Sequence, residues 1–209
     1  MDAEAFLESV ESSMTTELDR LSSSKSLIAL TDASLDRGPV LRVAAGRERA
    51  ATEAFEVWAE TADEPARATF EGVAARHRSN LDEILELEDS PDSPPASSEP
   101  MHASLTDDED SIERAAALVA RSLVDERVTK QVVGFFVNDA DRIAANQFRD
   151  VRESMNASRD DGLELLASIC ASDDDWGRAA AAAEATIQAA YDNYVDVLEG
   201  MGVNPKPVC

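Results

Sequence analysis

The sequence contains very few lysines, histidines and cysteines. Three of its 19 basic residues are lysines (Lys25, Lys130 and Lys206), and it has two histidines and two cysteines. The cysteines, Cys170 and Cys209, provide neither a disulfide framework nor a metal-ligand spacing. No apolar run approaches the roughly 20 residues needed to cross a bilayer, and no basic-then-apolar leader is present. We therefore expect a cytoplasmic protein with no membrane partner.

Positive charge is also scarce relative to negative charge. The chain has 43 acidic and 19 basic residues, which gives a formal net charge of −24. Such self-repulsion strains a compact fold at low ionic strength, whereas molar salt shortens the Debye length to about 3 Å. The excess of Asp and Glu with so little Lys favours a cytoplasmic protein of a salt-accumulating halophile. An acidic interaction protein of ordinary cells is the alternative.

Strand signals are almost absent, and aromatic residues make up 5% of the chain. Helical periodicity is strongest in Ser111–Val137, where two apolar stripes run at steps of three and four. The second stripe is interrupted by Glu126 and Lys130 before it resumes at Val133. A helix that is apolar on most sides belongs in the middle of a bundle. We therefore expect an all-α fold organised around this segment.

The same periodicity predicts helices before and after the central one. The predicted elements are a first helix with Leu7, Val10, Met14, Leu18 and Leu21 on one face, helices at about 40–61 and 65–88, a helix over 139–158 that is broken by Gly162, a short helix over 163–171, and a last helix that starts at a Ser172 cap and stops at Gly200. Two helical hairpins with extra N- and C-terminal helices form a ferritin-like or similarly wound helical bundle.

The stretch Asp89–Leu105 contains four prolines and five serines and has almost nothing to bury. It predicts a flexible linker between an N-terminal half, residues 1–88, and a C-terminal half, residues 106–202. Thr106–Glu109 has the pattern of a capping box for the central helix. Residues 203–209 form a tail, and the whole chain is one helical domain in two halves.

Polar residues on apolar stripes are the candidate site, because burying them unpaired costs a few kcal/mol. Glu48, His77 and Glu126 occupy such positions on three different predicted helices. In four-helix bundles, facing carboxylates and histidines of this kind hold two metal ions. If these three residues derive from such a site, they should point at one another inside the bundle.

At this point the chain shows a resemblance to known families. Glu48 with Ala51, Phe55 and Trp58-Ala59, followed by Phe70 and His77, resembles the first helix pair of rubrerythrin-like members of the ferritin superfamily. From end to end the chain also resembles a family of haloarchaeal proteins that are labelled either rubrerythrin-like or transcription antitermination protein. The segments that show this resemblance are Arg20–Lys25, Gln131–Asp139 and Gly202–Cys209.

The resemblance implies a di-iron protein that handles peroxide or iron, but the ligand set is incomplete. Ala74 stands where a second-helix glutamate is expected, the 139–158 helix has no histidine, and His102 lies in the predicted linker. Three candidates supply too few ligands for carboxylate-bound iron. Glu48 and His77 are therefore interpreted as an ion pair inherited from a metal site, with Glu126 as a remnant position. No catalytic residue and no cofactor is predicted, and iron is the alternative.

The second label implies RNA binding, for which a basic stripe with stacking aromatics is expected. The arginines at 42–49 and 67–78 are instead interleaved with glutamates, so a nucleic-acid partner is not expected. We predict a degenerate rubrerythrin-like bundle that is non-catalytic and acts through an unidentified protein partner. The alternatives are a carboxylate-bridged di-metal protein and a transcription antitermination accessory factor. The sequence leaves a homo-oligomer open.

Overall fold

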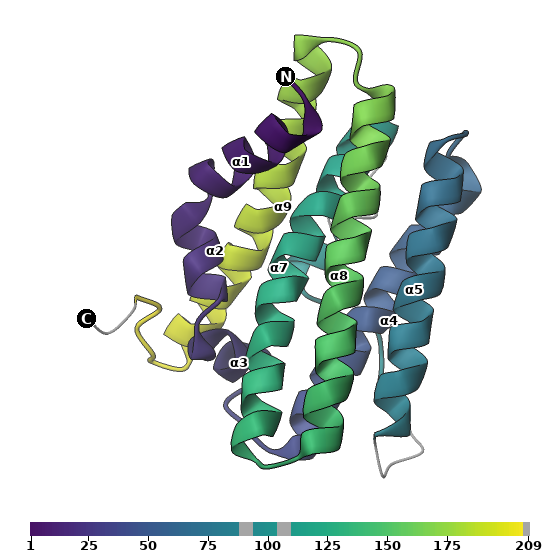
Figure 1. Ribbon diagram of the computed structural model, residues 1–209. Helices are drawn as coiled ribbons and strands as arrows, with labels where there is room; N and C mark the ends of the chain where they lie inside the picture. Colours follow the sequence, from purple (N-terminus) through teal and green to yellow (C-terminus); the bar gives the residue numbers. More distant parts are fainter. Residues whose placement is uncertain (88–93, 104–109, 207–209) are drawn as a thin grey trace.

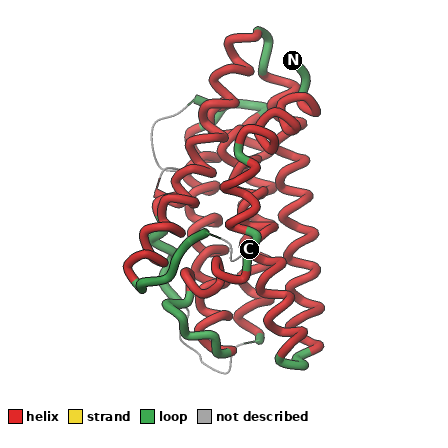
Figure 2. The backbone as a smooth tube through the Cα atoms, turned by 90° about the vertical axis from the view of Figure 1, so that its left-hand side faces the viewer, coloured by secondary structure: helices red, strands yellow, loops and turns green. Residues whose placement is uncertain are grey.

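The computed structural model describes residues 1–87, 94–103 and 110–206. Over these residues the chain is a bundle of α-helices with no strands, which confirms the predicted all-α class (Figure 2). The helices are α1 (Ala3–Ser13), α2 (Thr15–Leu21), α3 (Ser24–Leu30), α4 (Arg37–Thr61), α5 (Ala66–Glu86), α6 (Pro100–Ala103), α7 (Ser111–Asn138), α8 (Arg142–Ile169) and α9 (Asp173–Gly200). None of these helices is long and apolar enough to cross a bilayer.

The helix α7 lies in the middle of the bundle, as its two apolar stripes predict. It packs along α8 on one side and α9 on another, and α2, α3 and α4 also contact it (Figure 1). The α4–α5 hairpin joins the bundle mainly where α5 packs against α8. The short helices α1–α3 and the long α9 are therefore additions to two hairpins, α4–α5 and α7–α8.

The N-terminus of α7 is capped by Asp110, four residues after the Thr106 cap that the sequence pattern indicates. Asp110 accepts hydrogen bonds from the backbone N–H groups of Ile112 and Glu113, and the Glu113 carboxylate accepts one from the N–H of Asp110. This reciprocal arrangement is a capping box. The predicted cap at Thr106–Glu109 lies outside the described residues. The Ser172 cap of α9, with Asp175 as its partner, is confirmed.

The prediction that Gly162 breaks a helix is wrong. The helix α8 runs without interruption from Arg142 to Ile169, so the predicted short helix at 163–171 is its last part. A Cβ atom at Gly162 would lie 2.9 Å from Cγ2 of Val119 and 3.2 Å from Cγ of Leu118 on α7. Glycine is present here because α7 and α8 approach closely, and the packing gained outweighs its cost of about 1 kcal/mol in a helix.

The first predicted helix is in fact two helices. Four residues of its apolar stripe are buried and Leu7 is half-buried, but the chain bends at Met14, between α1 and α2. This bend lets α1 pack against α8 and α9 while α2 packs against α7 and α9. Periodicity alone does not detect such a bend, because the stripe continues through it.

Residues 94–103 do not fit the expectation that the 89–105 stretch has little to bury. Met101 and His102 are 0% and 5% exposed, and the backbone N–H of Ser97 donates to the carbonyl of Gly46 on α4 at 2.8 Å. The short helix α6 also packs against α4 and α9. The serine and proline content of this segment does not indicate its burial, because the segment makes its contacts with distant parts of the chain. The rest of the predicted linker, residues 89–93 and 104–105, lies outside the described residues.

The apolar core consists of two clusters at different heights along the bundle. On α4, Ala44 and Ala45 belong to one cluster and Ala51 to the other, and on α5 the same change occurs between Ala74 and Leu81. Between these positions on α4 and α5 lie the buried polar side chains of Arg47, Glu48, His77 and Asn80. The polar layer, which is the candidate site, consists of these residues together with the buried His102, Arg121 and Asp125 and the half-buried Glu99.

Candidate functional site: a buried polar layer

Two of the three residues singled out by sequence meet in one half of the polar layer. Nδ1 of His77 donates to Oε2 of Glu48 at 2.7 Å, and His77 is 1% exposed. Nδ2 of Asn80 also donates to Oε2 of Glu48, at 3.1 Å, and to Oγ of Ser154 on α8 at 2.7 Å. The His77 ring stacks on Phe55 with ring centroids 5.5 Å apart. The predicted Glu48–His77 pair is thus a buried, hydrogen-bonded unit.

The third predicted residue, Glu126, takes a different partner. Its carboxylate pairs with the guanidinium of Arg152 on α8. Among the described residues, no group of three or more His, Cys, Asp or Glu side chains could hold a metal ion. The structure therefore brings Glu48 and His77 together and leaves Glu126 in a separate ion pair. Ala74, where the resemblance leads us to expect a glutamate, is buried in the apolar core.

The other half of the polar layer is built around two buried arginines. Arg121 is 1% exposed, and its Nε lies 2.9 Å from Oδ2 of Asp125, one helical turn away on α7. Oδ1 of the same carboxylate accepts a hydrogen bond of 2.5 Å from Arg47 on α4. Arg47 also pairs with Glu99, which lies just before α6. One aspartate thus joins α4 to α7, and Arg47 joins both to residues 94–103.

His102 completes this cluster as a neutral imidazole. Nη1 of Arg121 donates to its Nδ1 at 2.5 Å, so the ring proton resides on Nε2, which lies 3.5 Å from Oε1 of Glu99. Nη2 of Arg121 donates to the backbone carbonyl of Arg47 at 3.0 Å. Each terminal nitrogen of the Arg121 guanidinium therefore has an acceptor, as burial of such a group requires.

Burial opposes every charge in this cluster, so each carboxylate depends on the arginines beside it. Burial raises the pKa of Asp125, but the charges of Arg121 and Arg47 lower it by a larger amount. The resulting pKa is therefore below the usual value for aspartate. Burial raises the pKa of Glu99, but the charge of Arg47 together with hydrogen bonds to His102 and Arg47 lowers it by more, so the resulting pKa is low. Burial, with the nearby charge of Arg121, lowers the pKa of His102 to about 4. At neutral pH the positive charges of Arg47 and Arg121 therefore balance the negative charges of Glu99 and Asp125.

The sequence contains one indication of this cluster, which lies among the apolar stripes of the central helix. Arg121 and Asp125 stand four residues apart on a helix that is apolar on most sides, which places an ion pair on one face. We did not single out this pair from the sequence, and in the structure both residues are buried. No sequence signal identifies Glu99 or His102, because their partners are distant in the chain.

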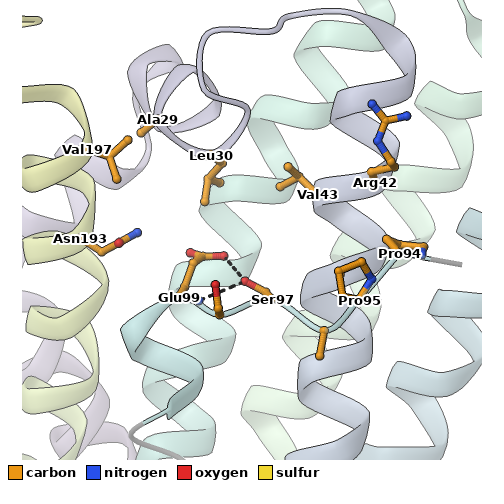
Figure 3. Close-up of a pocket in the computed structure, with 13 residues that line it drawn as sticks. Ala29, Leu30, Arg42, Val43, Pro94, Pro95, Ser97, Glu99, Asn193 and Val197 are labelled. Carbon is orange, nitrogen blue, oxygen red and sulfur yellow. Dashed lines mark hydrogen bonds between the residues drawn. The ribbon is translucent and has the colours of Figure 1, made fainter. Parts of the chain in front are cut away.

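A groove opens on the surface beside the cluster. It has a volume of about 450 Å³ and lies between α3, α4, α9 and residues 94–99; we call it the 94–99 groove (Figure 3). Its lining consists of Ala29, Leu30, Arg42, Val43, Gly46, Pro94, Pro95, Ala96, Ser97, Ser98, Glu99, Asn193 and Val197. Oγ of Ser97 donates to Oε1 of Glu99 at 2.8 Å in its floor. Glu99 therefore links the groove to the buried polar layer.

Comparisons of the chain with protein-family models, with curated proteins and with solved structures found no match.

Proposed function

We propose that this protein is a non-catalytic helical bundle that acts by binding another protein, and that its polar layer is the remnant of a ferritin-like metal site. The observation that supports this most is the pairing of two carboxylates of the polar layer, the buried Asp125 and the half-buried Glu99, with arginines. Asp125 lies between the guanidinium groups of Arg47 and Arg121, and Glu99 pairs with Arg47. In a carboxylate-bridged metal site, metal ions would balance these charges.

The donor set does not fit two metal ions. Glu48 and His77 provide one carboxylate and one imidazole, and Glu48 already accepts hydrogen bonds from His77 and Asn80. Carboxylate-bound iron needs several oxygen ligands in a fixed geometry, and an arginine beside the site would repel a cation. Arg121 lies close enough to Glu48 for the charge of that carboxylate to affect the pKa of Arg121. The layer is therefore interpreted as a structural ionic core.

The arrangement of arginines gives less support to a transcription accessory factor. Arg76 and Arg78 on α5 pair with Asp161 and Glu56. Arg47 is buried in the polar layer and does not reach solvent. Arginines that are engaged by carboxylates are not available to neutralise phosphates, which dominate affinity for nucleic acids. A protein partner is therefore preferred to an RNA partner.

The test is metal analysis of untagged protein purified from iron-supplied cells, combined with assays for peroxidase and ferroxidase activity. We expect less than stoichiometric iron, no oxo-bridge absorption band and no turnover. His77→Leu should lower the free energy of unfolding by about 1–3 kcal/mol, because Glu48 loses a buried hydrogen bond. His77→Gln, which retains an amide donor, should cost less. Stoichiometric iron that His77→Leu releases would support the di-metal alternative instead.

A further inference from the structure

We infer that the 94–99 groove binds a short extended segment of a partner protein that carries an aliphatic side chain next to a carboxylate. This inference rests on the proposed function, since it assigns the surface through which the protein would bind its partner. Four separate segments of the chain form the walls, and none of the lining residues is aromatic. Its volume of about 450 Å³ lies in the range of sites that enclose a ligand.

The walls select for an aliphatic side chain. Leu30 from α3 and Val43 from α4 point toward the middle of the groove, and Pro95 borders it on the opposite side (Figure 3). Leu30 and Val43 are only half-buried, so apolar surface remains open to solvent in the groove. Burying that surface is favourable by roughly 25 cal/mol per Å². A leucine, isoleucine or valine of the partner fits this chemistry.

An unused amide selects for a peptide backbone. The half-buried side chain of Asn193 on α9 points into the groove, and it makes no hydrogen bond within the described part of the chain (Figure 3). A carboxamide both donates and accepts, so it can pair with the C=O and N–H groups of one extended residue. Because Asn193 is only half-buried, its amide is open to solvent in the groove, where the backbone of a bound peptide can reach it.

An uncompensated cation selects for a carboxylate. Arg42 is exposed at the outer end of the groove, and within the described residues its guanidinium has no ion-pair partner. The cluster behind the groove contributes no net charge, because Arg47 and Arg121 are balanced by Glu99 and Asp125. Although the whole chain is strongly acidic, screening in molar salt limits interactions to a few ångströms. Of the two charged residues that line the groove, Glu99 is paired with Arg47, so Arg42 is the one left for a carboxylate that contacts it directly.

The floor of the groove is held in place before any partner binds. The Ser97 N–H donates to the carbonyl of Gly46 at 2.8 Å, and Glu99 is tied to Arg47. A Cβ atom on Gly46 would lie 3.0 Å from the carbonyl oxygen of Pro95, so glycine permits this close approach. A preformed floor lowers the ordering cost of binding.

The test uses the full chain and an array of fluorescein-labelled seven-residue peptides in molar KCl, with fluorescence anisotropy as the measurement. Each peptide carries two central leucines or two serines, followed by aspartate, asparagine or lysine. We expect the leucine–aspartate peptides to bind most tightly. In Arg42→Glu the preference should shift from aspartate to lysine, by roughly tenfold in relative affinity. Asn193→Trp, which fills the groove, should abolish binding.

The matched control is Arg149→Glu, which makes the same charge change on α8, away from the groove. Arg149 donates a hydrogen bond to Asn146 and, like Arg42, has no ion-pair partner among the described residues, so its replacement should leave the peptide preference unchanged. Thermal melts of all three variants establish that each is folded. Binding that is equal for leucine and serine peptides, or a preference that Arg42→Glu does not change, would overturn the inference. Iron binding with turnover would instead refute the proposed function, whatever the peptides do.

Discussion

Replacing Asp125 by asparagine removes the carboxylate that both buried arginines share. The side chain keeps its shape, so the perturbation is one of charge and not of volume. Arg47 retains its pair with Glu99. Arg121 retains hydrogen bonds to His102 and to the carbonyl of Arg47, but no carboxylate remains in direct contact with it. Two guanidinium groups then face each other across a neutral amide.

The magnitude follows from burial. Asp125 is 4% exposed and Arg121 is 1% exposed, so water does not screen the charge that is left. Breaking a buried ion pair by removing one partner typically costs about 3–5 kcal/mol, because the other charge remains buried without compensation. For a chain of this size that corresponds to a fall of roughly 6–20 °C in melting temperature.

The assay is urea unfolding at constant KCl, followed by circular dichroism, with Glu126→Gln as the matched control. Glu126 is the next residue on α7, and its side chain is 18% exposed while that of Arg152 is 42% exposed. Solvent screening limits this second pair to at most about 1 kcal/mol. Equal losses for Asp125→Asn and Glu126→Gln would refute the idea that a buried ionic core stabilises the bundle.

Three further predictions concern packing, pH and salt. Gly162→Ala should destabilise the protein by about 1–3 kcal/mol in urea, because its methyl group meets Val119, whereas Gly134→Ala, which faces open space, should be neutral or stabilising. The low pKa of His102 means that the unfolded chain takes up a proton near pH 6.5 and the folded chain only near pH 4. Stability should therefore fall by about 3 kcal/mol as the pH falls through that window, and His102→Gln should lack this component; the same slope in both proteins would exclude His102 as its source. With a net charge of −24, the melting temperature should rise between about 0.1 and 3 M KCl, and a flat profile would contradict the halophilic interpretation.

Helix positions followed from the sequence wherever local chemistry determines them. The apolar stripes of α7 and α9 located both helices, and the Ser172 cap and Gly200 marked the ends of α9. Gly162 was misread because a glycine that ends a helix and one that allows close helix packing have the same identity in the sequence. The distinction depends on Val119, which is brought close only by folding.

The candidate site also has a part that the sequence predicts and a part that depends on the tertiary structure. Glu48 and His77 could be found from the sequence because each interrupts an apolar stripe, and burial of an unpaired polar group is costly enough to require a partner. Glu126 satisfied the same criterion, yet Arg152 is its partner.

By itself, the sequence determined the all-α class, the central position of α7 and the excess of negative charge, because periodicity and composition act within a few turns of helix or over the whole chain. Only the tertiary structure decided which charges face one another. The ion pairs of Arg47 with Glu99 and Asp125 connect residues 52 and 78 positions apart. No local pattern specifies them, since burial, which makes these pairs necessary, arises only when α4, α7 and residues 94–103 come together.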